Sequence, residues 1–508
     1  DLQVEALRSG LETIVARHEP LRTTFRDTAD KPVQVIALPG RLDLPQIDLS
    51  GLPQAARDRV MGQLSRESAR RPFDLEHGPL LRLLLLRLTS ESHGLVLVFH
   101  HIVFDGSSVQ VLLRELTALY EAAVHGHSAT LPELDLQYAD YAAWQRDWLR
   151  GDILETQLAW WREQLSGAPP LLALPTDRPR PASPGNAGAV VSLALSNELS
   201  RDLETLCRQR HVTLFMGLLT GVLTTLHHLS GQQDLSLGTV TGARDQLEIE
   251  DLIGFFVNTL VLRTDLSGDP ALHELLERVR TGVLQAYANR DLPFEKLVEE
   301  LPERDLAHTP FFQVIFSLND AETLVEHAVG DLTLEPLPIE SDLAKFDLTL
   351  RAQKTAQGLL LAAGYRTELF DRTTMQRFLT TLEGVLAGAV ADPDARLSEL
   401  ETLPKAQRHQ LLWEWSDTTT AFPRDEEVHR LFEQQSQRTP EALAIESAEG
   451  WVSYGELDRR ATLLAHRLRR LGVGFFDIKK RIRFTDTEIE RNNTKDGYKK
   501  IFKAYDLE

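Results

Sequence analysis

A proline-rich segment near residue 175 places the strongest limit on how this chain can fold. Six prolines lie between Pro169 and Pro184, and Gly185 and Gly188 follow them. Proline fixes φ and removes a backbone donor, so neither a helix nor a central strand continues through such a segment. Short apolar runs alternate with amphipathic stretches on both sides of it, which predicts an α/β fold in two lobes.

Apolar periodicity predicts the elements of each lobe. In the first lobe, expected at residues 1–170, a helix is predicted over residues 4–15, strands at 33–36, 80–88 and 95–99, and a helix at 107–123. In the second lobe, expected at residues 171–399, strands are predicted near 190–195, 235–240, 258–262, 313–317 and 359–363, and helices at 213–229 and 271–288.

The remainder of the chain changes character twice. Residues 400–425 are polar and irregular, as in a linker, and a third unit is expected to begin at about residue 426 and to stop near residue 474. Residues 475–508 hold six lysines, whereas the preceding 474 residues hold five. This tail is therefore expected to be foreign to the fold, as a fusion scar or gene-model error would be, with a basic docking tail as the alternative.

Composition argues against several classes of function. A formal charge of −20 disfavours nucleic acid as a partner, and no apolar run approaches the roughly 20 residues of a membrane span. Cys207 is the only cysteine, so no intrachain disulfide is available and a cytoplasmic location is expected. The start at Asp1 shows neither an initiator methionine nor a signal peptide, which suggests a start inside a larger chain.

The clearest chemical feature is the heptapeptide HHIVFDG at residues 100–106. It joins the predicted strand at 95–99 to the predicted helix at 107–123. Ser107 and Gln110 have the spacing of a capping box, so the loop is expected to end at exposed helical N–H groups that can stabilise an oxyanion. Histidine titrates near neutrality and can move a proton during acyl transfer, and Gly106 permits close approach of a substrate.

Roles follow for the polar residues of this loop. If an amine is the nucleophile, no serine or cysteine is needed, and His101 takes a proton from the tetrahedral intermediate or positions the amine. Asp105 is expected to hold the loop through an ion pair. A metal site at His100, His101 and Asp105 is disfavoured because a strand projects adjacent histidines to opposite faces.

Residues 100–106 match the HHxxxDG pattern of the condensation domains of nonribosomal peptide synthetases, in the chloramphenicol acetyltransferase-like superfamily. Further stretches resemble condensation-domain motifs in the same order, with Arg263 following the third of them: RHEPLRTTF at 17–25, YADYAAW at 138–144, IGFFVNT at 253–259 and DLPFE at 291–295. The resemblance covers about residues 1–400. VSYGEL at 452–457 is similar to the first motif of an adenylation domain, which identifies 426–474 as the start of such a domain.

The resemblance implies a V-shaped pseudo-dimer of two acetyltransferase-like lobes around a central tunnel. It implies amide-bond formation between substrates on upstream and downstream peptidyl carrier domains, whose phosphopantetheine arms meet at the active site; no cofactor is bound directly. His101 carries over as the catalytic residue and Gly106 as a backbone contact at the reacting centre. Supporting roles fall to other residues: His100, Asp105 with Arg244 as its partner, Arg17, Arg22 and Asn258.

The chain also departs from the family pattern. The family's opening motif is absent, as would be expected if the chain starts after it, and Ser107 stands where tryptophan is common. An epimerization domain is disfavoured by the residues after Gly106, and a heterocyclization domain would carry aspartates in place of the histidines. Two alternatives remain: a free-standing acyltransferase that uses coenzyme A, and a non-catalytic recruitment module of the same fold.

Overall fold

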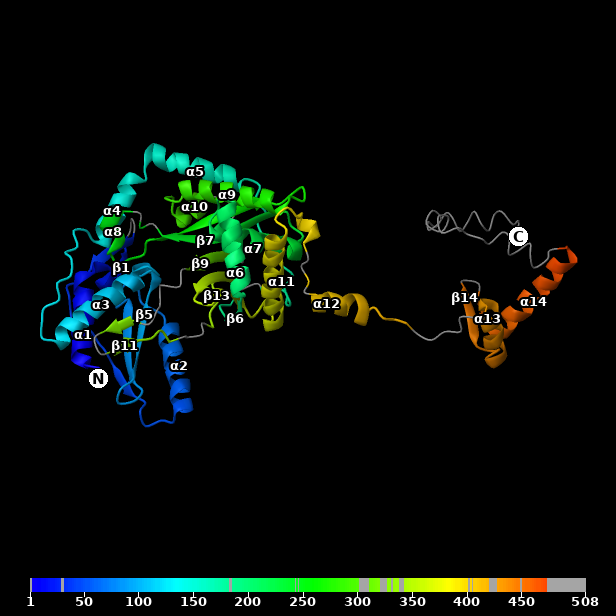
Figure 1. Ribbon diagram of the computed structural model, residues 1–508, viewed down its shortest axis with the longest axis horizontal. Coiled ribbons are helices and arrows are strands. Elements are labelled where there is room, and N and C mark those ends of the chain that lie inside the picture. Colours follow the sequence, from blue (N-terminus) through cyan, green and yellow to red (C-terminus); the bar gives the residue numbers. More distant parts are fainter. Residues whose placement is uncertain are drawn as a thin grey trace. The chain divides into compact units, whose positions relative to one another are not determined.

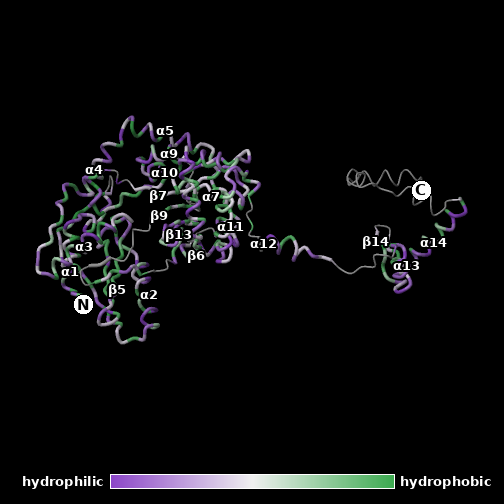
Figure 2. The backbone as a smooth tube through the Cα atoms, viewed as in Figure 1, coloured by the Kyte–Doolittle hydropathy of each residue, from purple (hydrophilic) through white to green (hydrophobic). Residues whose placement is uncertain are grey.

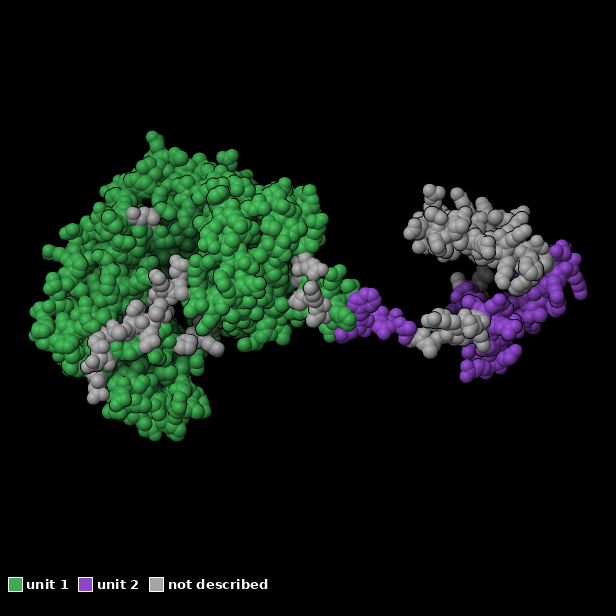
Figure 3. Space-filling model, viewed as in Figure 1, with its two compact units in different colours: residues 1–412 green, residues 413–508 purple. Residues whose placement is uncertain are grey.

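The computed structural model describes residues 2–28, 32–181, 185–242, 244, 246–300, 310–319, 327–329, 332–337, 342–400, 403, 405–419, 427–447 and 450–472. The chain divides into two compact units, residues 1–412 and 413–508 (Figure 3). The tail at 475–508 lies outside the described residues.

The first lobe of the larger unit is built on a three-stranded sheet in the order β3-β4-β5 (Figure 1). Its strands are β3 (Gln46–Asp48), β4 (Leu81–Arg87) and β5 (His93–Phe99), and its helices are α1 (Val4–Arg17), α2 (Gln54–Arg70) and α3 (Ser108–Val124). Alternate leucines of β4 enter opposite clusters: Leu83 and Leu85 pack with α1 and α3, whereas Leu84 and Leu86 pack with α2. Both faces of this sheet are therefore covered.

Smaller elements complete this half of the chain. The hairpin β1 (Thr23–Asp27) and β2 (Pro32–Ile36) forms a separate antiparallel pair. Helices α4 (Tyr138–Trp148) and α5 (Gly151–Leu165) follow α3. Three apolar side chains of α5, Leu158, Trp161 and Leu165, belong to the core of the second lobe. The helix before the proline-rich segment therefore packs on the lobe that follows it.

The second lobe contains a six-stranded mixed sheet in the order β6-β13-β12-β9-β7-β8 (Figure 1). Its strands are β6 (Gly188–Ala194), β7 (Asp234–Gly242), β8 (Val257–Asp265), β9 (Val314–Asn319), β12 (Leu348–Thr355) and β13 (Gly358–Arg366). Its main helices are α6 (Asn197–Gln209), α7 (Leu214–Ser230), α9 (Leu272–Ala288) and α11 (Arg372–Ala391). Shorter helices are α8 (Leu247–Glu250) and α10 (Phe294–Glu300). The antiparallel pair β10 (His327–Val329) and β11 (Leu332–Leu334) instead packs on the first lobe, where Leu332 and Leu334 meet the core.

Five of the six strands in the sheet of the second lobe match strands predicted from periodicity. The sixth, β12, was not predicted. The β12 sequence LTLRAQKT alternates buried and more exposed positions, because Leu348, Leu350 and Ala352 face the core. That alternation is the pattern of a strand with one covered face. Polar and apolar stretches along all the elements can be followed in Figure 2.

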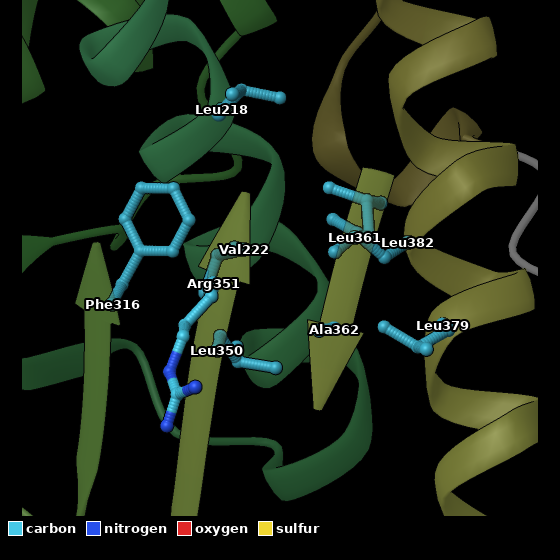
Figure 4. A pocket seen from close by; sticks show the side chains of 9 residues that line it. All are labelled: Leu218, Val222, Phe316, Leu350, Arg351, Leu361, Ala362, Leu379 and Leu382. Carbon is cyan, nitrogen blue, oxygen red and sulfur yellow. The ribbon is translucent and has the colours of Figure 1, made fainter. Parts of the chain in front are cut away.

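Two small cavities lie among the helices of the second lobe. The first, about 10 Å³, is enclosed by side chains of the sheet, α7 and α11 (Figure 4). The second, about 30 Å³, borders Cys207, whose burial raises its thiol pKa to about 11. A thiol with such a pKa remains protonated at neutral pH.

The second unit contains α13 (Val428–Arg438), the antiparallel pair β14 (Leu443–Ser447) and β15 (Gly450–Ser453), and α14 (Tyr454–Arg470). Helix α12 (Lys405–His409) and a π-helical turn (Gln410–Glu414) lie at the division between the units. Ser453 caps α14 by accepting a hydrogen bond from the Glu456 backbone. Ser453 and Glu456 belong to the stretch that resembles an adenylation domain.

Among the described residues, no single helix combines the length and apolarity of a membrane span, although the bent pair of α6 and α7 passes that test by length and composition. Over the same part of the chain, no three His, Cys, Asp or Glu side chains are grouped as metal ligands would be.

Candidate active site

The HHIVFDG loop lies where β5 ends and α3 begins. The His100 N–H donates to the carbonyl of Leu80 at 2.9 Å, which extends the pairing of β5 with β4 by one residue. Residues 101–103 then form a single 3₁₀ turn. The rings of Phe99 and Phe104 stack with centroids 3.9 Å apart, so the two ends of the turn are held together by an apolar contact.

His101 is exposed, and its ring is held by the backbone through one nitrogen. Its Nδ1 lies 2.7 Å from the Phe104 carbonyl oxygen, and because a carbonyl can only accept, Nδ1 carries the proton. In the neutral ring, Nε2 then holds a lone pair, and the residue is exposed. This geometry gives His101 the form of a general base whose tautomer is fixed by the backbone.

His100 is turned inward and has a different role. Its Nδ1 accepts a hydrogen bond from the Ile102 backbone at 3.1 Å, and its ring meets Phe73 edge-on. Burial, followed by the charges of His101 and Lys345, lowers the pKa of His100 below its ordinary value. His100 is therefore held neutral as an acceptor that supports the turn, while its neighbour faces solvent.

Asp105 is 3% exposed and is the centre of a hydrogen-bond network. Its Oδ1 accepts from the backbone and hydroxyl of Ser108, at 2.9 and 2.8 Å, and from Nη2 of Arg244 at 3.0 Å. Its Oδ2 accepts from the Phe256 backbone at 3.0 Å. Four donors thus satisfy one buried carboxylate, two from the first lobe and two from the second.

The predicted capping box at Ser107 and Gln110 is wrong. Ser107 has helical backbone angles and its side chain makes no capping hydrogen bond. Asp105 takes the Ser108 N–H instead, and the next two N–H groups donate to the carbonyls of Gly106 and Ser107. A buried carboxylate therefore compensates the end of the α3 dipole, which removes the oxyanion site expected there.

Arg244 contacts Asp105 from the second lobe. Its Nη2 donates to Asp105 and to the Ser108 hydroxyl. Its Nη1 donates to three backbone carbonyls, those of Ile249, Glu250 and Leu252. The guanidinium carbon lies 4.3 Å from the centre of the Phe256 ring. Arg244 therefore joins the loop of the first lobe to the segment before β8, with a cation–π contact in addition.

Ser108 and Gly254 take part in the same junction, and no sequence pattern gave either of them a role. The buried Ser108 hydroxyl lies 3.1 Å from both the nitrogen and the carbonyl oxygen of Gly254. A Cβ on Gly254 would lie 2.4 Å from Cδ2 of Tyr138 and 2.8 Å from Cε2 of Phe256. Only glycine fits at this crossing of the two lobes.

We expect Gly254→Ala to lower the free energy of unfolding by about 1–3 kcal/mol, because the added methyl group must displace packed aromatic rings. Gly106→Ala is the matched control: a Cβ at Gly106 would meet no heavy atom within 4 Å. Its effect should stay within about 0.5 kcal/mol. Denaturant melts of the two variants measure the difference, and equal stabilities would contradict this packing.

Asn258, in β8, connects two of the family-like stretches. Its side-chain amide donates to the carbonyls of Arg290 and Leu292, at 2.7 and 2.8 Å. Its oxygen accepts from the Phe294 backbone at 3.0 Å. Asn258 therefore fixes residues 290–294 against the sheet, and these hydrogen bonds do not reach the His101 loop.

Arg17 and Arg22 are also remote from His101 in their contacts. Arg17 pairs with Glu115 of α3 at 3.0 Å, and Arg22 bonds locally to Ala37 and Glu19. Burial alone would raise the pKa of Glu115, but hydrogen bonds and charges from His18 and Arg17 outweigh it, so that pKa lies below its ordinary value. Arg17 thus stabilises the packing of α1 on α3.

Comparison with known proteins identifies the family. Residues 1–412 match the family model described as Condensation domain. One of the linear gramicidin synthase proteins of Brevibacillus parabrevis is 43% identical over 477 residues, which is 93% of this chain and 6% of that protein. The phosphinothricin tripeptide synthetase PhsC of Streptomyces viridochromogenes is 41% identical over 92% of this chain and 43% of its own length. The chain thus spans a small part of most such relatives.

Solved structures share the fold. The X-domain from teicoplanin biosynthesis, also solved in a complex with OxyB, aligns with a TM-score of 0.72 at 29% identity over 79% of this chain and 90% of its own. A four-domain nonribosomal peptide synthetase bound to AMP and glycine aligns with a TM-score of 0.76 at 23% identity, over 92% of this chain and 36% of that one. The predicted α/β fold is confirmed, and the chain belongs to the condensation-domain family of nonribosomal peptide synthetases.

Proposed function

We propose that residues 1–412 catalyse amide-bond formation between a donor acyl or peptidyl thioester and the amine of an acceptor aminoacyl thioester. One observation carries the proposal. His101 is exposed on a loop that Asp105 anchors in both lobes, with Nδ1 bonded to a backbone carbonyl and Nε2 free to take a proton. Gly106 leaves open space beside it for the reacting groups.

The reaction follows from this geometry. The acceptor nitrogen attacks the thioester carbonyl, forms the C–N bond and gives a tetrahedral intermediate. Nε2 of His101 takes the proton that the nitrogen loses, and that proton passes to the sulfur as the C–S bond breaks. An α-amino group has a pKa of about 8, so a useful fraction is already nucleophilic at neutral pH.

The partners in this proposal are carrier domains whose phosphopantetheine arms deliver both thioesters as substrates through a central tunnel. The relatives are named as synthetases much longer than this chain, which supports a position between other domains. Residues 426–474 are proposed as the start of an adenylation domain. The match to the gramicidin synthase and the alignment with the four-domain synthetase both extend beyond residue 412. A cytoplasmic location completes the proposal.

A recruitment module is the second candidate. The complex of the related X-domain with OxyB favours it, because it shows a domain of this fold binding another protein. A docking surface needs no exposed, tautomer-fixed histidine. The exposed His101, whose tautomer is fixed by the Phe104 carbonyl, supports catalysis instead.

The proposal is tested with the full 508-residue chain, a donor loaded on a carrier domain and an aminoacyl acceptor loaded on a second carrier. We expect mass spectrometry to detect the condensed product on the acceptor carrier. The same donor supplied as its coenzyme A thioester should react far more slowly. Equal rates would favour the free-standing acyltransferase, and no product from either donor would favour the recruitment module.

A further inference from the structure

Four consecutive residues that precede β8 are fixed by four side chains of the first lobe. The Ile253 N–H donates to Nδ1 of the buried His18 at 3.3 Å, and Gly254 is bonded to Ser108. The carbonyl of Phe255 accepts from the Tyr138 hydroxyl at 2.9 Å, and the Phe256 N–H donates to Asp105. Segment 253–256 is therefore positioned by the lobe that carries the histidine loop.

The donors and acceptors that fix this segment are themselves held. His18 is fully buried, and its Nε2 lies 2.9 Å from Glu115 of α3. Burial, followed by the charges of Tyr141, Asp105 and Glu295, raises the pKa of Tyr138 above its ordinary value, so its hydroxyl remains a donor at neutral pH. A segment restrained at every residue can place a side chain accurately.

The side chain that this segment places against the loop is Phe255. Its ring centroid lies 5.0 Å from that of His101, with the planes at 72°. Phe255 is half-buried, whereas Phe256 is buried in the cluster beneath. The hydrogen bond at Nδ1 leaves the imidazole able to tilt about that contact, and an edge-to-face ring contact removes this freedom.

We propose that Phe255 is a positioning residue for His101, whose ring holds the imidazole plane so that Nε2 keeps one direction toward the reacting groups. This inference rests on the proposed function, because the direction of Nε2 matters only if His101 moves a proton. It assigns to the second lobe a part in orienting a catalytic group that belongs to the first.

The test compares Phe255→Leu, which removes the ring at similar volume, with Phe255→Tyr, which keeps it and has room for a hydroxyl because the residue is half-buried. With loaded carriers and the full chain, we expect Phe255→Leu to lower kcat about 10-fold or more, since small misplacement of a catalytic group is costly. KM should change little, because Phe255 is not assigned to binding. Phe255→Tyr should restore most of the parental kcat.

Phe73→Leu is the matched control, because Phe73 meets His100 rather than His101 in a similar edge-on contact. NMR of labelled histidine supplies a readout that does not depend on turnover. The imidazole C–H signals of His101 should shift in Phe255→Leu, stay near parental values in Phe255→Tyr, and stay unchanged in Phe73→Leu. If Phe255→Leu does not fold, Phe255→Met replaces it.

Unchanged His101 signals in a folded variant without the ring would overturn the inference, and so would shifted signals with parental kcat. Failure of the proposed function is distinguishable from both outcomes, because the parental chain itself would then form no product.

Discussion

Replacing Asp105 by asparagine should lower the free energy of unfolding by about 3–5 kcal/mol, the usual cost of breaking a buried ion pair from one side. The substitution changes almost no volume, so the loss is electrostatic. Arg244 would keep its charge at a site where its side chain is 9% exposed, opposite a neutral amide.

An amide cannot satisfy this site in either orientation. All four partners of the carboxylate donate: two from Ser108, one from Arg244 and one from the Phe256 backbone. Whichever way the asparagine turns, its NH₂ group faces a donor, and only the Ser108 hydroxyl can rotate to accept. Rearrangement of the side chains around the asparagine can therefore recover little of the lost free energy of unfolding.

Asp251→Asn is the matched control, because Asp251 also pairs with an arginine, Arg114, at 2.6 Å, but with 45% of its side chain exposed. Its cost should stay below about 1 kcal/mol. The two variants are compared by chemical denaturation at neutral pH. Equal losses would show that Asp105 does not have the structural role assigned to it. Asp105→Asn should also slow condensation, since the His101 loop loses its anchor.

Sequence patterns predicted the parts of the site that depend on local order. The strand, turn and helix around residues 100–106 follow from apolar runs and spacing within about 30 residues, and the structure places them as predicted. The pairing of Asp105 with Arg244 was proposed from the family motifs, and the structure brings those two side chains together.

What the sequence could not supply depends on contacts between distant segments. Ser108 looks like an ordinary first-turn residue until Gly254, 146 positions later, lies against its hydroxyl. The capping box at Ser107 failed for a similar reason: Asp105, held in place by donors from the second lobe, accepts the first N–H of α3, and the Gln110 N–H donates to the Ser107 carbonyl. The spacing of residues within the loop could predict neither the contact of Ser108 with Gly254 nor the donors that the second lobe supplies to Asp105.

The catalytic assignment predicts the largest change in rate. His101→Ala should lower amide formation by roughly 10²- to 10⁴-fold, the usual range for a general base, with a further loss if the imidazole also positions the amine. The melting temperature should stay close to the parental value, because His101 is exposed and, among the described residues, its side chain makes a single hydrogen bond, within its own turn. Carrier binding should also persist, because in the proposed function His101 acts only on the reacting amine.

His125→Ala is the matched control, because His125 is likewise exposed and likewise lies with Nδ1 2.8 Å from a backbone carbonyl, at the far end of α3. It should condense at the parental rate.

The most direct measurement is therefore the single-turnover rate of product formation by parental, His101→Ala and His125→Ala chains, with donor and acceptor carriers loaded stoichiometrically, beside a melting curve of each. If the family's opening segment is needed for folding, all three proteins carry it. A loss of two or more orders of magnitude in His101→Ala alone, at unchanged melting temperature, is the predicted result. Condensation by His101→Ala at the parental rate would contradict the account and leave the loop with a structural role only.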